Sequence, residues 1–216
     1  MSNQEWFRKT TWTESDKEDF FARLKRSRKS SRVQYLKIQA YHLYETNRLK
    51  EISAALELNN LALEEHPERI HQAQLLEQKA ECLNKLGKVD EAEENFLLAL
   101  QAMREVPNVK PNVPFSFGLF VIEHKINRLH KEALQVLDEF NDMKSGIIFP
   151  TTEYYFYGIK AIILHREGNS KEAEPLAQKA MAASEKQVSG FSRHPKVGLV
   201  SKTENMLYNE LASVAQ

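Results

Sequence analysis

A pattern of paired helices that recurs along the chain constrains the fold more than any other feature. In residues 75–107, apolar side chains recur at helical spacing on both sides of Gly87. The same order recurs after Pro150 around Gly168, which lies 81 residues after Gly87. The recurring positions are Leu76, Ala80, Leu83, Leu86, Ala92, Phe96, Ala99 and Leu100, then Tyr154, Tyr157, Ala161, Leu164, Ala173, Ala177, Ala180 and Met181. A repeated helix pair buries its apolar faces by stacking on its neighbours, so the pattern predicts a helical array.

Two looser copies of the pattern complete the array. One contains Phe117, Val121, His124, Ala133, Leu137 and Phe140, with Asn127 and Arg128 at its turn, and an earlier one contains Leu43, Ala55, Ala62, Leu63 and Pro67. The corresponding alanines Ala55, Ala92, Ala133 and Ala173 are 37, 41 and 40 residues apart. Glycine and proline number only 7 each, and hairpin dipeptides of β-proteins are absent. An all-α fold follows, and an antiparallel helical bundle is the alternative to the array.

Short motifs in the second helices carry a family resemblance. The segments Lys-Val-Asp-Glu-Ala at 88–92 and Ser-Lys-Glu-Ala at 170–173 resemble the tetratricopeptide repeat (TPR) family, and about 158 of the 216 residues are covered. This resemblance implies a right-handed α-solenoid of about four helical hairpins. Residues 6–8, 32–36 and 190–195 are similar to a group of uncharacterised bacterial TPR proteins, which implies no known activity.

The ends of the chain are predicted to cap the array in one continuous domain. Residues 1–32 form the N-terminal capping segment, 33–190 the four hairpins and 191–216 the C-terminal capping helix, which we expect at 199–214. Thr13 and Asp16 approximate a capping box that starts a helix over 14–29. The aromatic residues Trp6, Phe7 and Trp12 are interpreted as packing on the first hairpin, with a ligand cage as the alternative.

Local signals predict several turns and caps. Gly87 suits the left-handed residue that ends a helix, and Asp90 is predicted to cap the next one. Residues 107–114 are expected to be extended because of their three prolines, and 144–152 to expose or bury Ile147, Ile148 and Phe149. Thr151 or Thr152 is predicted to cap the following helix. Pro175 predicts a later helix start or a bend.

Composition narrows the partners and the compartment. Lysine plus arginine number 30, as do aspartate plus glutamate, so no net charge attracts nucleic acid, and we consider it an improbable partner. The basic residues Arg23, Lys25, Arg26, Arg28, Lys29 and Arg32 follow acidic ones, and we interpret this order as a complement to a helix dipole. Without a signal peptide or a membrane-spanning apolar run, the expected localisation is cytoplasmic.

No sequence motif predicts catalysis. Phosphate-binding and dinucleotide glycine loops, zinc-binding histidine pairs and the nucleophile elbow are all missing. The seven histidines lack metal-ligand spacing, and the single cysteine, Cys82, lies on an apolar helix face, where a packing role is expected. The sequence therefore predicts a protein that is not an enzyme and that needs neither a metal nor a cofactor.

The TPR resemblance implies where a partner would bind. In that family the first helix of each hairpin lines a concave groove, and its positions here are Lys37, Tyr44, Asn47, Arg48, Gln74, Glu77, Glu81, Asn84, Lys85, Lys125, Tyr155, His165 and Arg166. Long polar donors and tyrosines suit a peptide backbone with carboxylates, although a solvated helix face has the same composition. The carboxylate clamp of chaperone-binding TPR proteins has no residue-by-residue match. The expected function is a protein- or peptide-binding scaffold or adaptor; the alternatives are a peptide-sensing regulator, an enzyme and a nucleic-acid binder.

Overall fold

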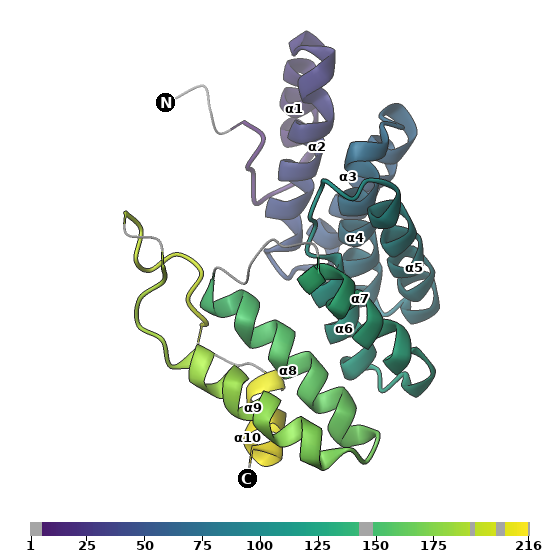
Figure 1. Cartoon of the computed structure of the whole chain (residues 1–216). Coiled ribbons are helices and arrows are strands. Elements are labelled where there is room, and N and C mark those ends of the chain that lie inside the picture. The colour runs from purple at the N-terminus through teal and green to yellow at the C-terminus, as the bar shows by residue number, and fades with distance from the viewer. Residues whose placement is uncertain (1–5, 143–148, 191–192, 202–205, 216) are drawn as a thin grey trace. The chain divides into compact units, whose positions relative to one another are not determined.

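The computed structural model describes residues 6–142, 149–190, 193–201 and 206–215, and all its regular elements are helical (Figure 1). The described helices are α1 (Glu14–Arg26), α2 (Lys29–Tyr44), α3 (Leu49–Glu65), α4 (Arg69–Lys85), α5 (Val89–Glu105), α6 (Val113–Glu123), α7 (His130–Asp142), α8 (Pro150–Arg166), α9 (Ser170–Ser184) and α10 (Met206–Val214), with a 3-10 turn η1 (Asn127–Leu129). The prediction of an all-α fold is confirmed.

The chain divides into two compact units, residues 1–113 and 114–216. The prediction of one continuous domain rests on the repeat pattern and stays a prediction. The repeat pattern does not reveal this division, because the helical spacing continues on both sides of it. Each unit is described by itself below.

The hairpins are built as the recurring pattern predicts. Helix α2 packs with α3, α4 with α5, and α8 with α9 (Figure 1). Helices α6 and α7 meet through Phe115 and Phe140, whose ring centroids are 4.8 Å apart. The repeated alanines of the second helices are completely buried. Small side chains at these positions let paired helices approach closely, which is a packing arrangement consistent with a helical repeat.

A left-handed residue lies in the turn of every hairpin. Gly87 has φ 76° and Gly168 has φ 80°, whereas Asn47 and Lys125 adopt φ 55° and 54° despite their side chains. At Gly87, the N–H donates to the Asn84 carbonyl over 2.9 Å, and the next N–H reaches back to Leu83 over 3.0 Å. This pair of bonds is the Schellman motif, and it confirms the predicted role of Gly87.

The third turn differs from its prediction. Lys125, rather than Asn127 or Arg128, is the left-handed residue, and its N–H donates to Ile122 over 3.2 Å. Asn127 and Arg128 belong to η1, which leads into α7. The sequence does not indicate that Lys125 takes the left-handed position, because lysine, unlike glycine, has no preference for left-handed backbone.

Several predicted helix boundaries shift by a few residues. Helix α1 has the predicted capping box, but it ends at Arg26 instead of residue 29 because Ser27 is extended. Helix α2 begins at Lys29, so the predicted end of the capping segment at residue 32 falls inside α2. Helix α5 starts after Lys88 without a side-chain cap, which places Asp90 in its first turn. Helix α6 already begins at Val113, one residue before Pro114, which shortens the predicted extended connector.

The start of α8 corrects another prediction. Pro150 is the first helical residue and Phe149 takes the cap position without a side-chain hydrogen bond. Thr151 and Thr152 therefore lie in the first turn and do not cap it. Proline suits this position because its fixed φ is helical and it has no N–H to leave unpaired. Ile147 and Ile148 lie outside the described residues.

In the second unit, α10 packs on α8 and α9 (Figure 1). Gly158 permits this contact, since a Cβ atom there would lie 3.0 Å from Leu211 and 3.1 Å from Leu207. Helix α9 begins at Ser170, so Pro175 lies inside the helix and the predicted later start is wrong. Helix α10 begins at Met206, later than the expected 199, and residues 202–205 lie outside the described part. In the described ranges no helix is long and apolar enough to cross a membrane.

Candidate functional site

Predicted groove residues of α2 and α4 meet on one face of the first unit. The Lys37 Nζ donates to the Gln74 Oε1 over 2.5 Å. The Lys85 Nζ donates to the Asn47 side-chain oxygen and lies 4.2 Å from the centroid of the Tyr44 ring. Residues predicted to line the groove therefore connect α2 and its following turn to α4 at two places. We call this surface the α2–α4 face.

Burial differs strongly among the residues of this face. Lys37 is 7% exposed and Glu77 5%, whereas Gln74 and Lys85 are exposed. Burial lowers the pKa of the Lys37 ammonium. Glu81 and Asn84 are half-buried. Only part of the predicted set is thus open to a partner, while Lys37 and Glu77 belong to the packing between helices.

The face is shallow. Its hollow has a volume of about 10 Å³, room for a single water, and is lined by Ala40, Tyr41, Tyr44, Asn59, Gln78, Glu81 and Cys82. Sites that enclose a small molecule are usually far larger. This surface therefore suits contact with another chain better than enclosure of a small ligand.

Arg48 is tied to its own unit. Its Nη2 atom lies 3.1 Å from the Glu51 carboxylate and donates to the Thr10 carbonyl. Arg48 thus joins the start of α3 to the N-terminal segment. The neighbouring Asn47 supplies the left-handed residue of the turn.

In the second unit, the predicted residues lie at both ends of α8 and in one turn. Tyr155 is half-buried in the first half of α8, and burial raises the pKa of its phenol. His165 is exposed in the last turn. Lys125 and Arg166 come together because both donate to the Ile122 carbonyl, Lys125 from its N–H and Arg166 from Nη1 over 2.8 Å.

Arg166 is engaged within the unit by a bidentate ion pair. Its Nε atom lies 2.8 Å from one Glu210 oxygen, and Nη2 lies 2.9 Å from the other. Glu210 belongs to α10, so Arg166 fastens α10 to α8 and to the end of α6. No local sequence pattern indicates this pairing, because the two residues are 44 positions apart.

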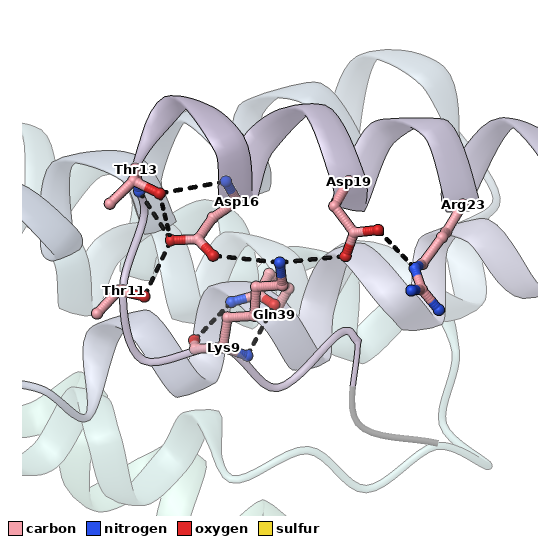
Figure 2. A network of polar contacts seen from close by, with 7 residues as sticks. All are labelled: Lys9, Thr11, Thr13, Asp16, Asp19, Arg23 and Gln39. Carbon is pink, nitrogen blue, oxygen red and sulfur yellow. Dashed lines mark hydrogen bonds and ion pairs between the residues drawn. The ribbon is translucent and has the colours of Figure 1, made fainter. Parts of the chain in front are cut away.

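The N-terminal segment forms a site that sequence reasoning missed. The Lys9 N–H donates to Gln39 Oε1 over 3.0 Å, and Gln39 Nε2 donates to the Lys9 carbonyl over 2.7 Å (Figure 2). Gln39 is completely buried. A helix side chain thus holds an extended backbone by its donor and its acceptor at once.

Charged residues of α1 fix the same segment (Figure 2). The Lys9 ammonium lies 3.1 Å from carboxylate oxygens of both Asp16 and Asp19. Burial of Asp16 opposes its ionisation, but hydrogen bonds from Thr13, Thr11 and Lys9 prevail and hold its pKa well below the usual range. Hydrogen bonds from Arg23 and Lys9 likewise lower the pKa of Asp19.

An open cleft lies where the N-terminal segment meets the turn between α1 and α2. Its volume is about 480 Å³, and its lining residues are Trp6, Arg23, Arg26, Ser27 and Tyr35. The basic residues were visible in the sequence. Their proximity to Trp6 is not evident from the sequence, because it depends on how the N-terminal segment packs against α2.

Cys82 has the environment of a packing residue. It is 1% exposed, and the Asn59 amide nitrogen lies 3.9 Å from its sulfur. Burial raises the pKa of the thiol to about 12. A nucleophilic cysteine needs a lowered pKa and access to solvent, so this site has the opposite properties.

Comparisons with known proteins give a likeness of fold. Neither a family model nor a curated protein matches the chain. Among solved structures, that of BtubC (BKLC) from P. vanneervenii matches with a TM-score of 0.60 and 17% sequence identity. The match covers 79% of this chain and 71% of BtubC. At this identity the likeness shows that the two chains share a helical fold.

Proposed function

We propose that this chain is a protein-binding scaffold of the TPR kind and that it holds an extended protein segment on the α2–α4 face. The observation that supports this most is the contact of Lys85 with both the Asn47 amide and the Tyr44 ring, together with the separate Lys37–Gln74 hydrogen bond on the same face. A lysine held between an amide and a ring face is positioned for a carboxylate, while the tyrosine accepts apolar groups.

A second observation supports the same binding mode. Gln39 on α2 hydrogen-bonds both backbone groups of Lys9, so this helix already binds one extended segment of its own chain. Since every peptide has the same backbone groups, such contacts give affinity and the side chains of the face give specificity. The proposed activity is binding and does not include catalysis.

The test begins with a partner captured by the full chain and mapped to a segment. We expect Lys85→Ala and Tyr44→Ala to weaken that segment's binding by about 1–3 kcal/mol each, the usual range for charged hydrogen bonds and buried rings. Lys171→Ala is the matched control, because Lys171 is an exposed lysine on α9. Equal affinity of all three variants would reject the α2–α4 face as the site.

A peptide-sensing regulator is the second candidate, and the division into two compact units favours it. A ligand that binds one arrangement of the units better than another shifts the population between them. Small-angle scattering with and without the captured segment separates the two functions. A scaffold keeps its scattering profile on binding, and a sensor changes it.

A further inference from the structure

The cleft between the N-terminal segment and the α1–α2 turn combines guanidinium groups with aromatic walls. Arg23 and Arg26 line it from the end of α1, and Trp6 and Tyr35 line it from the other elements. Its volume of about 480 Å³ is within the usual range for ligand sites. The hollow on the α2–α4 face is far smaller, at about 10 Å³.

The charge around this cleft is predominantly positive, although Asp19 pairs with Arg23 beside it. Residues 20–44 contain seven lysines and arginines and no aspartate or glutamate. Because the whole chain has no net charge, the other residues carry seven more acidic than basic side chains. Arg26, Arg28 and Lys29 are exposed at or beside the turn. The zero net charge of the chain argues against nucleic-acid binding at long range, but it does not exclude a positive potential at this cleft.

Local hydrogen bonds orient the cations. Arg23 Nε lies 2.7 Å from Asp19 Oδ1, and Arg26 Nε donates to the Ala22 carbonyl over 3.2 Å. Arg32 Nη2 donates to the Lys25 carbonyl over 2.8 Å, which fastens α2 to the end of α1. Arg26 has five N–H donors, and the one that it uses for orientation costs little of its capacity to bind phosphate.

The aromatic walls are also fixed. The ring centroids of Trp6 and Tyr35 are 4.8 Å apart, and Trp6 also packs 5.3 Å from Phe20. Trp6 and Tyr35 are nevertheless only half-buried and line the cleft. Fixed, partly exposed rings beside arginines are the features with which proteins stack a base and hold its phosphate.

We propose that this cleft binds one nucleotide of a single-stranded nucleic acid, with the base against Trp6 and Tyr35 and the neighbouring phosphates on Arg23 and Arg26. The exposed cations beside the cleft extend the positive surface past one nucleotide, which favours a strand over a free nucleotide. An acidic peptide without aromatic side chains satisfies the arginines but offers no ring to stack on Trp6 and Tyr35. This site is distinct from the proposed α2–α4 face, and each can fail without the other.

The experiment titrates the full chain into fluorescein-labelled oligo(U) of twelve nucleotides and follows anisotropy at several salt concentrations. Replacing both Arg23 and Arg26 by alanine is expected to weaken binding at least about tenfold. The slope of the logarithm of the binding constant against the logarithm of the salt concentration should become less negative by about 1.4, or about 0.7 for each phosphate contact. Trp6→Ala is expected to weaken binding by a similar factor through lost stacking. The control replaces the exposed cations Lys171 and Arg193 and removes the same charge.

Tryptophan fluorescence gives an independent measurement. Oligo(U) should quench the half-buried Trp6, and the quenching should disappear in Trp6→Phe, since Trp12 is only 5% exposed. Arg26→Ala alone provides the charge test if loss of the Arg23–Asp19 pair unfolds the protein. The proposal would be overturned if oligo(U) did not bind, or if the control variant lost as much affinity. It would also be overturned if polyglutamate or ATP bound as tightly as oligo(U).

Discussion

The side-chain amide of Gln39 pairs with both backbone groups of Lys9, as a neighbouring strand would in a sheet. The two bonds measure 3.0 and 2.7 Å, and Gln39 is completely buried (Figure 2). An extended segment in a helical protein has no strand to satisfy its backbone, so a helix side chain takes that part. Residues 6–13 are thereby fixed to α2 as part of the first unit.

Replacing Gln39 by leucine tests this relationship. The variant keeps roughly the same side-chain volume but leaves the N–H and carbonyl of the half-buried Lys9 without their partner, so we expect a loss of about 1–3 kcal/mol in the free energy of unfolding. Urea denaturation measures it, and hydrogen exchange should speed up at the Lys9 amide. Gln135→Leu on the surface of α7 is the control, with an expected change within about 0.5 kcal/mol. Unchanged exchange at Lys9 would contradict the pairing.

Acid should weaken the N-terminal anchor through Asp16. Its pKa in the folded chain lies below the unfolded value of about 3.9, so ionised Asp16 stabilises the fold above that pH. The stabilisation is lost as the pH falls below the unfolded pKa towards the folded one. We expect Asp16→Asn to lower the melting temperature at pH 6 and to lower it less at pH 3. An equal decrease at both pH values would show that the carboxylate's charge is irrelevant.

Cys82 should be unreactive in the folded protein. With a pKa of about 12 and 1% exposure, almost no thiolate is present or accessible at pH 8. A chromogenic disulfide reagent should therefore modify Cys82 slowly in buffer and rapidly in concentrated urea. Equal rates in both solvents would mean that the first unit opens readily or that the thiol is not buried.

Gly158 should not tolerate a valine side chain, because α10 lies against it. A single Cβ atom would already come within 3.0 Å of Leu211 and 3.1 Å of Leu207. Gly158→Val is therefore expected to cost about 1–3 kcal/mol by overpacking. Thermal unfolding measures the effect. Gly190→Val serves as the control, since a Cβ atom at Gly190 meets nothing within 4 Å.

The sequence allowed some of these features to be predicted because they depend on local patterns. Buried alanines and the Gly87 turn follow from helical spacing and from the freedom of glycine in left-handed backbone. Lys125 occupies the equivalent turn without any such preference, so the surrounding packing must impose its conformation. Glycine therefore marks the turns at Gly87 and Gly168 in the sequence, whereas no residue preference marks the turn at Lys125.

Long-range pairings explain why the candidate sites were harder to predict. Gln39 and Lys9 are 30 residues apart, and helical spacing does not indicate that an extended segment crosses α2. The predicted groove positions rested on which face of a helix each residue occupies. That reasoning places Lys85 beside Tyr44, but it does not show that Lys37 is buried or that another helix engages Arg166.

Arg166 is expected to contribute to stability, because its bidentate pair with Glu210 and its bond to the Ile122 carbonyl join α8 to α10 and to α6. Both side chains of the pair are less than one third exposed, so solvent screens their interaction only partly. We expect Arg166→Ala to lower the free energy of unfolding by about 1–3 kcal/mol, and Glu210→Ala by less, because the latter leaves the Ile122 bond in place. A double-mutant cycle measured by urea denaturation should give a coupling energy of about 1 kcal/mol or more, with Lys171→Ala as the uncoupled control. Additive losses, or a melting temperature unaffected by Arg166→Ala, would contradict this role and leave Arg166 available to a partner.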